Sequence, residues 1–348
     1  MNQESFGTSR DNQAVTVYTI ENSRGMRVRV TDYGAALVSI IVPDRNGTMQ
    51  DVLLGYDNVT GYENNTCYFG AVIGRNGNRI ADAKITINGI PYQLDANDNE
   101  NNLHSGFHGV DKKIWNVTEQ TGQAITLSCT SKDREQGFPG TMDIKVRYLV
   151  TDENALEIHY QAVSDQDTVA NFTNHSYFNL SGHASGDILG HELTLAASHF
   201  TPVIDAKAIP TGEIAPVAGT PMDFTSAKTI GRDIEADDIQ LTYGGGYDHN
   251  FVLDHSAGGA FSFMAQAYAP DTGIEMRAYT DCPGVQLYTG NMITPQTGKQ
   301  GAAYDKRQGF CLESQYHPNA VNEPNFKSPL IKAGEVYTSK TSYQFGVR

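Results

Sequence analysis

Apolar and polar residues alternate one by one over several stretches of the chain. Residues 26–31, 142–150 and 156–162 place apolar side chains at every second position. Because successive side chains of an extended chain point to opposite faces, this period predicts β-strands with one face in a core. The apolar run 35–42 is also typical of a strand and stops at the turn cluster Pro43-Asp-Arg-Asn-Gly47.

Asn88-Gly89 joins two short apolar alternations, at residues 85–87 and 90–94. Both turn residues tolerate positive φ, so the pattern predicts a two-residue β-hairpin. Pro91 cannot donate a ladder hydrogen bond, and we therefore expect the second strand at a sheet edge or a bulge.

These frequent strand patterns, separated by 34 glycines and 13 prolines, predict an all-β fold, a large antiparallel β-sandwich. Helical periodicity is rare, and we expect a turn or two of helix within residues 225–234. No internal repeat or linker interrupts the sequence, and all-β domains reach this size. We therefore expect residues 1–348 to form a single domain.

The net charge of −15 disfavours nucleic acid and anionic membrane surfaces as partners. The first ten residues are polar and predict no secretory signal, and no apolar run approaches the roughly 20 residues of a membrane helix. The cysteines lie far apart without a CxxC pair, which indicates reduced thiols and a cytoplasmic protein. They are Cys67, Cys129, Cys282 and Cys311.

The stretch 171–182, with sequence NFTNHSYFNLSG, holds an imidazole among small polar and aromatic residues. In an extended chain His175 and Tyr177 point to one side, and Phe172 and Phe178 to the other. A His and a Tyr on one side are typical of a polar pocket wall, and His is suited to proton transfer near neutral pH. The alternative is a structural histidine held by hydrogen bonds.

Two other segments carry groups suited to a polyhydroxylated ligand. Gly74-Arg-Asn-Gly-Asn-Arg-Ile80 lacks the helix and the lysine of a phosphate loop, so its arginines favour a donor fork for sugar oxygens. The alternative for Arg79 is a packing or surface residue. After three glycines, Asp248 can accept hydrogen bonds from ligand hydroxyls, unless that segment is an ordinary turn.

Two later segments add an amide and a carboxylate. Alternation within residues 283–291 places Gln286 and Tyr288 on the side opposite the core. Glu313 follows the apolar residues 310–312, where a carboxylate is costly unless it is paired or functional.

We expect no metal and no cofactor. The polar stretch 95–106 has Glu100 and Gly106 where a calcium loop requires Gly and Glu. His104 and His108 have metal-like spacing only on a helix, and the Ser105-Gly106 step between them disfavours one. Dinucleotide, HExxH and GxSxG motifs are also absent from the sequence.

Taken together, segments in order along nearly the whole chain resemble the aldose 1-epimerase (galactose mutarotase) family. The segments are Tyr33-Gly-Ala35, GRNGNRI (74–80), Asn101-Asn-Leu-His104, TNHSYFNL (173–180), Ile209-Pro-Thr-Gly-Glu213, Tyr247-Asp-His-Asn-Phe251, PGVQLYTGN (283–291) and GFCLESQ (309–315). The resemblance implies a large β-sandwich enzyme that interconverts the α and β anomers of free aldohexoses such as D-galactose and D-glucose, as a monomer or homodimer.

The resemblance also implies roles for individual residues. Glu313 is expected to be the general base and His175 the general acid. The residues expected to bind the sugar are Asn78, Arg79, His104, Asp248 and Gln286, together with Tyr177 from the pocket wall. Gly77 and Ser105 depart from the residues that the family has more often, Ala and Gly.

Three alternative functions use the same residues. A glycoside hydrolase would work with two carboxylates, Asp248 and Glu313. A non-catalytic carbohydrate-binding protein would hold the sugar without turnover. A hexose-6-phosphate mutarotase would need extra basic residues near the pocket, and the sequence shows no such cluster.

Overall fold

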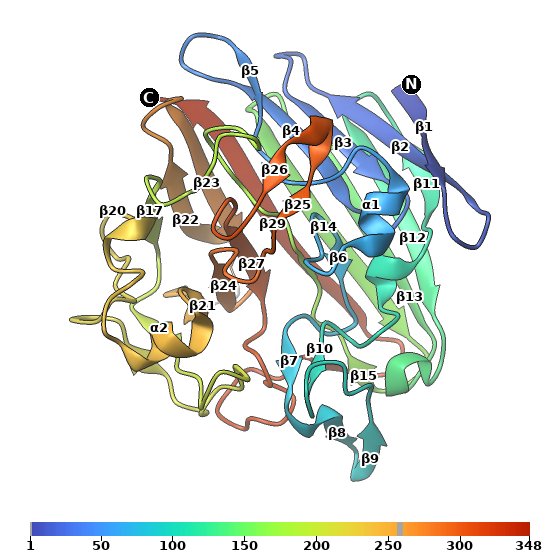
Figure 1. Cartoon of the computed structure of the whole chain (residues 1–348). Helices are drawn as coiled ribbons and strands as arrows, with labels where there is room; N and C mark the ends of the chain where they lie inside the picture. Colours follow the sequence, from blue (N-terminus) through green and yellow to red (C-terminus); the bar gives the residue numbers. More distant parts are fainter. Residues whose placement is uncertain (1, 256–259) are drawn as a thin grey trace.

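The computed structural model describes residues 2–255 and 260–348, and antiparallel sheets dominate it (Figure 1). The largest is a nine-stranded sheet. Its strands lie in the order β11 (Asn116–Gln120), β12 (Ala124–Ser131), β13 (Met142–Val150), β14 (Ala155–Ser164), β29 (Val336–Val347), β23 (Ile274–Thr280), β22 (Ser262–Tyr268), β17 (Glu192–Leu195) and β20 (Lys228–Thr229).

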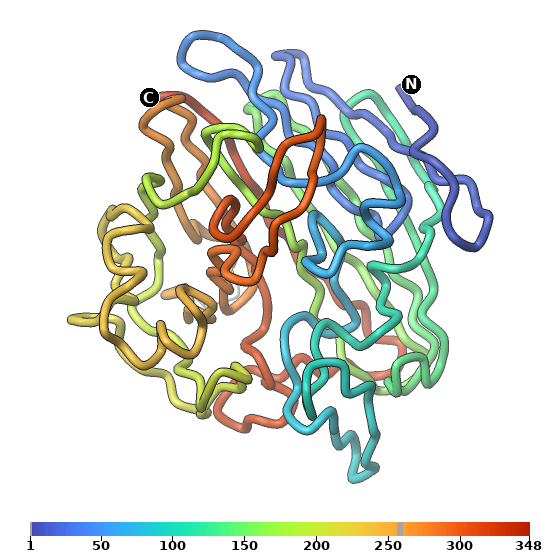
Figure 2. Tube along the Cα trace, viewed as in Figure 1, coloured from blue at the N-terminus to red at the C-terminus, as the bar shows by residue number. Residues whose placement is uncertain are grey.

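An N-terminal five-stranded sheet packs beside the β12–β14 part of this large sheet, blue against green in Figure 2. Its strands follow chain order: β1 (Asn2–Thr8), β2 (Ala14–Glu21), β3 (Arg27–Thr31), β4 (Leu37–Pro43) and β5 (Met49–Asp51). The hydroxyl of Tyr148 on β13 donates to the carbonyl of Ala35 at 2.7 Å, which joins the two layers at a buried point.

A second five-stranded sheet faces the other half of the large sheet. Its order is β19 (Ala215–Pro216), β18 (His199–Thr201), β21 (Asp248–Val252), β24 (Gly284–Tyr288) and β27 (Cys311–Gln315). The Tyr343 hydroxyl on β29 donates to the Leu312 carbonyl on β27 at 2.8 Å. Single bridges from Phe178 to Leu53 and to Phe310 connect this sheet to the N-terminal one. The stretch 171–182 therefore runs between the two smaller sheets.

The alternating pattern predicts these layers correctly. Along β13 every second side chain, from Met142 to Val150, is buried, and the residues between them are exposed or half-buried. One core cluster contains Val28 from β3, Ile144 from β13 and Leu312 from β27. The predicted all-β antiparallel sandwich is confirmed.

The predicted hairpin is also confirmed. β8 (Lys84–Ile87) and β9 (Ile90–Gln93) form a two-stranded sheet, with φ of 52° at Asn88 and 76° at Gly89. Pro91 lies in this isolated pair, consistent with the expected edge position. The other short pairs are β16 (Thr173–Asn174) with β6 (Val72–Ile73), β10 (Asn102–Leu103) with β7 (Arg79–Ile80), β15 (Thr168–Val169) with β28 (Leu330–Ile331), and β25 (Gln296–Thr297) with β26 (Ala303–Tyr304).

Helices are few and short. The expected turn within residues 225–234 is a 3₁₀ turn at Ile230–Arg232 that follows β20. Two six-residue helices, α1 (Val59–Asn64) and α2 (Ile239–Gly244), were not predicted, because six residues are too few to show a helical period. Both begin at capping side chains, Asn58 and Asp238. Among the described residues, no helix has the length and apolar character needed to cross a membrane.

Arg75 is the most deeply buried cation of the segment that leads to the site, with 1% of its surface exposed. Its guanidinium donates to the carbonyls of residues 131, 132, 139 and 140 and to the hydroxyls of Ser131 and Thr168. Burial lowers its pKa to about 10. Of the two arginines in the segment 74–80 that the sequence suggested as donors to sugar oxygens, Arg75 is therefore a structural clamp between this segment and residues 131–140.

Arg75→Lys should lower the free energy of unfolding by roughly 3–5 kcal/mol, because one ammonium group cannot replace the planar fork and leaves buried carbonyls unpaired. Urea unfolding of the wild type and the variant measures this difference. Arg277→Lys is the matched control, since Arg277 is half-exposed and its partner Glu275 keeps a second cation, Arg348; its effect should stay below about 1 kcal/mol. Equal effects of the two substitutions would contradict the clamp.

Candidate active site

A cavity of about 250 Å³ opens between the two smaller sheets and the segments that join them. It is lined by Thr66, Cys67, Tyr68, Asn78, Arg79, Leu103, His104, His175, Tyr177, Asp248, Gln286, Tyr288, Met292 and Glu313. The eight residues predicted to act on or bind the sugar are all in this set. The structure thus brings together side chains that are up to 235 positions apart, from Asn78 to Glu313.

Three neighbouring strands supply the polar floor of the cavity. Glu313 on β27 pairs in register with Gln286 on β24, which pairs in turn with Asn250 on β21. The Gln286 amide donates to Asp248 Oδ1 at 2.7 Å. Glu313 Oε2 and Gln286 Oε1 are buried and have no hydrogen-bond partner among the described residues. Two buried acceptors on one sheet are therefore available to ligand hydroxyls.

His175 follows β16, and its backbone is fixed on both sides. Its N–H donates to Ala71 at 3.0 Å, and its carbonyl accepts from Gly70 at 2.9 Å. Phe172 and Phe178 are buried in the main core cluster, whereas His175 lines the cavity. The predicted alternation of this stretch is confirmed, even though only two of its residues belong to a strand.

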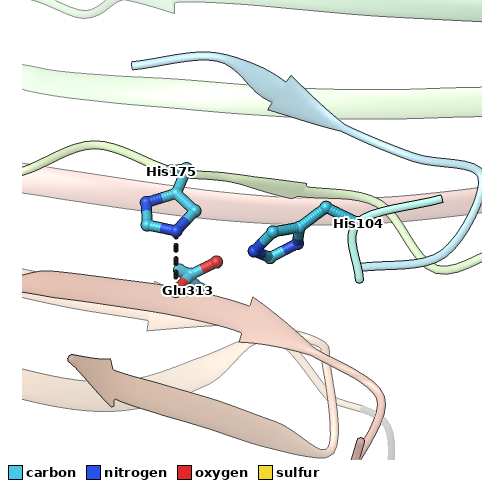
Figure 3. A group of neighbouring side chains, drawn as sticks. All are labelled: His104, His175 and Glu313. Atoms are coloured by element: carbon cyan, nitrogen blue, oxygen red, sulfur yellow. Dashed lines mark ion pairs between the residues drawn. The ribbon is translucent and has the colours of Figure 1, made fainter. Parts of the chain in front are cut away.

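His175 and Glu313 approach each other across the cavity (Figure 3). The distance from His175 Nε2 to Glu313 Oε1 is 3.7 Å, and both side chains are almost fully buried. His175 Nδ1 lies 3.5 Å from the thiol sulfur of Cys311, which is on the same face of β27 as Glu313. The imidazole thus has a carboxylate at one nitrogen and a thiol at the other.

His104 completes the group in Figure 3, since ligand atoms of His104, His175 and Glu313 lie within 4.8 Å of one another. The Asn78 backbone N–H donates to His104 Nδ1 at 3.1 Å. A neutral His104 then carries its proton on Nε2, where it is a hydrogen-bond donor without a lone pair for a metal. This arrangement suits a sugar oxygen better than a metal ion.

The loops that present these groups have strained backbone. Tyr68, Asn78 and His104 have φ of 59°, 61° and 51°, which residues with side chains seldom adopt. The Ser105 hydroxyl accepts from the Asn76 N–H at 2.8 Å and donates to the Asn76 carbonyl at 3.1 Å. The serine that departs from the family pattern therefore ties residues 76–79 to the loop that carries His104.

Burial dominates the electrostatics of the site. It lowers the pKa of His175 to about 3 and that of His104 well below its usual value. It raises the pKa of Glu313 well above the usual value, and the Asp248 charge raises it further. Burial raises the pKa of Asp248 as well, against the opposing effects of Arg79 and Gln286. Burial in this cavity therefore favours the uncharged forms of these side chains.

Arg79 is the cation of the cavity lining. Its Nε donates to Asp98 Oδ2 at 2.7 Å, and both side chains are largely buried. Asp98 belongs to the polar loop that the sequence compared with a calcium loop. Its position shows that this loop orients the guanidinium at the cavity edge.

Sequence reasoning missed several lining residues, including Thr66, Cys67, Tyr68, Leu103 and Met292. Leu103 belongs to the two-residue strand β10, which is too short to show alternation, and the other four lie in irregular segments, where alternation does not indicate which way a side chain points. Tyr68 and Tyr177 both stack on the His175 ring, with centroid distances of 5.7 and 5.1 Å and interplanar angles of 20° and 17°. The sequence carries no pattern that would have identified Tyr68.

Comparison with known proteins agrees with this geometry. The aldose 1-epimerase family matches residues 16–344. Human galactose mutarotase is 41% identical over 323 residues, which cover 92% of each chain. The aldose 1-epimerase of Escherichia coli K12 is 36% identical over 349 residues, which cover 99% of each.

Solved structures show the same fold. The aldose epimerase homologue from C. elegans has a TM-score of 0.88 at 28% identity and covers 96% of this chain and 99% of its own. Galactose 1-epimerase from Lactobacillus acidophilus has a TM-score of 0.85 at 26% identity, with coverage of 99% and 98%. On the family match and these identities, the chain belongs to the aldose 1-epimerase family.

Proposed function

We propose that this enzyme opens and recloses the ring of free aldohexoses such as D-galactose and D-glucose, with Glu313 as general base and His175 as general acid. Anomer interconversion itself follows from membership of the family. The observation that carries the residue roles is the approach of a buried carboxylate and a buried imidazole to 3.7 Å at the floor of one cavity.

The reaction needs two proton transfers. Glu313 removes the proton of the anomeric hydroxyl while His175 protonates the ring oxygen, so the C1–O5 bond breaks and an aldehyde forms. Rotation about C1–C2 exposes the other face of the aldehyde, and closure reverses both transfers. Each positioned acid or base contributes about 10²–10⁴ in rate. The cycle is complete with these two groups, because it produces no net change in their protonation.

Ring opening converts His175 and Glu313 from a charged pair into a neutral pair. It begins with imidazolium and carboxylate and ends with neutral His175 and protonated Glu313. Burial shifts the two pKa values in the directions that favour this neutral pair. The same burial therefore favours the opening step, while sugar hydroxyls donating to Glu313 stabilise the carboxylate before it.

The other lining groups fit sugar binding. His104 offers an Nε2–H donor, as its Nδ1 accepts from Asn78. Arg79 adds a charged donor, and Asp248 with Gln286 offers acceptors. Tyr177 contributes mainly through its ring, which stacks on His175. Together these groups match the donors and acceptors of a pyranose.

The alternatives have less support. Among the described lining residues Arg79 is the single permanently charged cation, and it is paired with Asp98, so a sugar phosphate would lack a counter-charge beside two carboxylates. Asp248 accepts a hydrogen bond from the Gln286 amide, which suits a role in sugar binding rather than attack on, or protonation of, a glycosidic bond. Membership of an isomerase family argues against a binding protein without turnover.

The proposal extends to the cellular setting. We place the protein in the cytoplasm as a monomer or homodimer, with free sugar as its partner and neither nucleic acid nor membrane. The four cysteines support a reducing compartment, because all are free and three are buried.

The purified enzyme should accelerate the change in optical rotation of fresh α-D-galactose and α-D-glucose. Prolonged treatment with EDTA should leave this rate unchanged, because the mechanism uses only protein acids and bases. Polarimetry before and after chelation, with added Zn²⁺ as a further arm, measures both. A rate lost to EDTA and restored by metal would contradict the mechanism.

Glu313→Gln and Asp248→Asn should have different kinetic effects. Glu313→Gln keeps the shape and removes the base, so kcat should fall by about 10²–10⁴-fold with sugar binding retained. Asp248→Asn removes a charged acceptor and should raise KM by about 10–100-fold. Steady-state polarimetry separates kcat from KM. Loss of turnover at saturating sugar in Asp248→Asn would instead favour a two-carboxylate mechanism.

His175→Asn should lower kcat by at least about 10²-fold with a smaller change in KM, because an amide cannot deliver a proton near neutral pH. The melting temperature should stay close to that of the wild type, since the side chains are similar in size. Kinetics and thermal unfolding on one preparation test both expectations. A destabilised variant with full activity would make His175 a structural residue.

A further inference from the structure

The proposed reaction requires a charged imidazole in a site where burial opposes the charge. The groups around His175 show what offsets this cost. Glu313 faces Nε2, and the neutral thiol of Cys311 faces Nδ1. Four aromatic rings also surround it: those of Tyr68, Tyr177, His104 and Tyr288 all lie within 6.3 Å, centroid to centroid.

Two of these rings stack on the imidazole. Tyr177 is almost fully buried, and its other contacts include Phe69 at 4.7 Å, so it belongs to the core of the N-terminal sheet as well as to the cavity. Tyr68 is half-buried, lies outside every strand and also meets the His104 ring edge at 4.8 Å. An aromatic face within about 6 Å of a cation attracts it, and more strongly where water is excluded.

Backbone hydrogen bonds hold Tyr68 next to His175. The turn 68–71 closes with a hydrogen bond from Ala71 N–H to the Tyr68 carbonyl at 3.0 Å. The same turn forms two hydrogen bonds with His175: the Ala71 carbonyl accepts from the His175 N–H, and the Gly70 N–H donates to the His175 carbonyl. Gly70 is required there, because a Cβ would lie 2.0 Å from the Leu37 carbonyl oxygen. Tyr68 itself has a φ of 59° and starts a turn that is hydrogen-bonded directly to the backbone of His175.

We propose that Tyr68 is a positioning residue for the reaction: its stacked ring orients the His175 imidazole toward Glu313 and stabilises the imidazolium. This inference rests on the proposed role of His175. Burial raises the pKa of the Tyr68 hydroxyl, which stays protonated, so the ring face rather than the hydroxyl carries the role. Lys112 Nζ lies 5.7 Å from the ring and donates to the Asn65 carbonyl, which helps to hold the loop in place.

Tyr68→Phe and Tyr68→Leu separate the ring from the hydroxyl. Tyr68→Leu should lower kcat about tenfold with KM within about twofold, since the lost interaction matters most for the charged imidazole. Tyr68→Phe keeps the ring and should retain the wild-type kcat. Phe107→Leu, at a 60% exposed ring of a neighbouring loop outside the cavity lining, is the control for loss of an aromatic residue and should change neither constant.

Melting temperatures of the four proteins, wild type included, should agree within a few degrees. An unchanged kcat in Tyr68→Leu, or equal losses in the Phe and Leu variants, would overturn the proposal. A rise in KM alone would also overturn it and make Tyr68 a sugar-binding residue. If wild-type enzyme mutarotates and His175→Asn does not, any of these results refutes the role of Tyr68 and leaves the proposed function intact.

Discussion

The buried guanidinium of Arg75 is the constraint on which the geometry of the site depends. It donates to carbonyls at the end of β12 and in the loop that follows it, and in doing so fixes the start of the segment that carries Asn78 and Arg79. From that segment the Asn78 N–H sets the tautomer of His104. A charge outside the cavity lining thus helps to determine which nitrogen of a cavity histidine is a donor.

The sequence predicted the sheets well in strands where buried and exposed positions alternate regularly. Along β13, and along β14 from Leu156 onward, buried side chains alternate with exposed or half-buried ones, and the period alone is sufficient. The hairpin at Asn88 followed from its turn chemistry. In contrast, α1 and α2 are held by caps and by packing, which a six-residue pattern does not reveal.

The sequence predicted which residues line the cavity better than it predicted what each arginine or tyrosine does there. His175 and Glu313 followed from the alternation and from the cost of a buried carboxylate, and the resemblance ordered the others around them. The pattern of residues 74–80 does not by itself distinguish Arg75 from Arg79, and only the resemblance selected Arg79, which lines the cavity, whereas Arg75 is enclosed by backbone carbonyls. Tyr68 was missed, because it lies outside every strand and has a positive φ, so a strand period does not predict the direction of its side chain.

The position of β29 has a consequence for synthesis of the protein. This strand comes last in chain order, yet it lies in the middle of the nine-stranded sheet, between β14 and β23. Until a ribosome has released these residues, β14 and β23 each leave a row of unpaired backbone groups, and a strand edge of this kind can recruit other chains. The large sheet therefore closes only after β29 has emerged from the ribosome, and until then the nascent chain depends on rapid folding or on chaperones to protect two open edges.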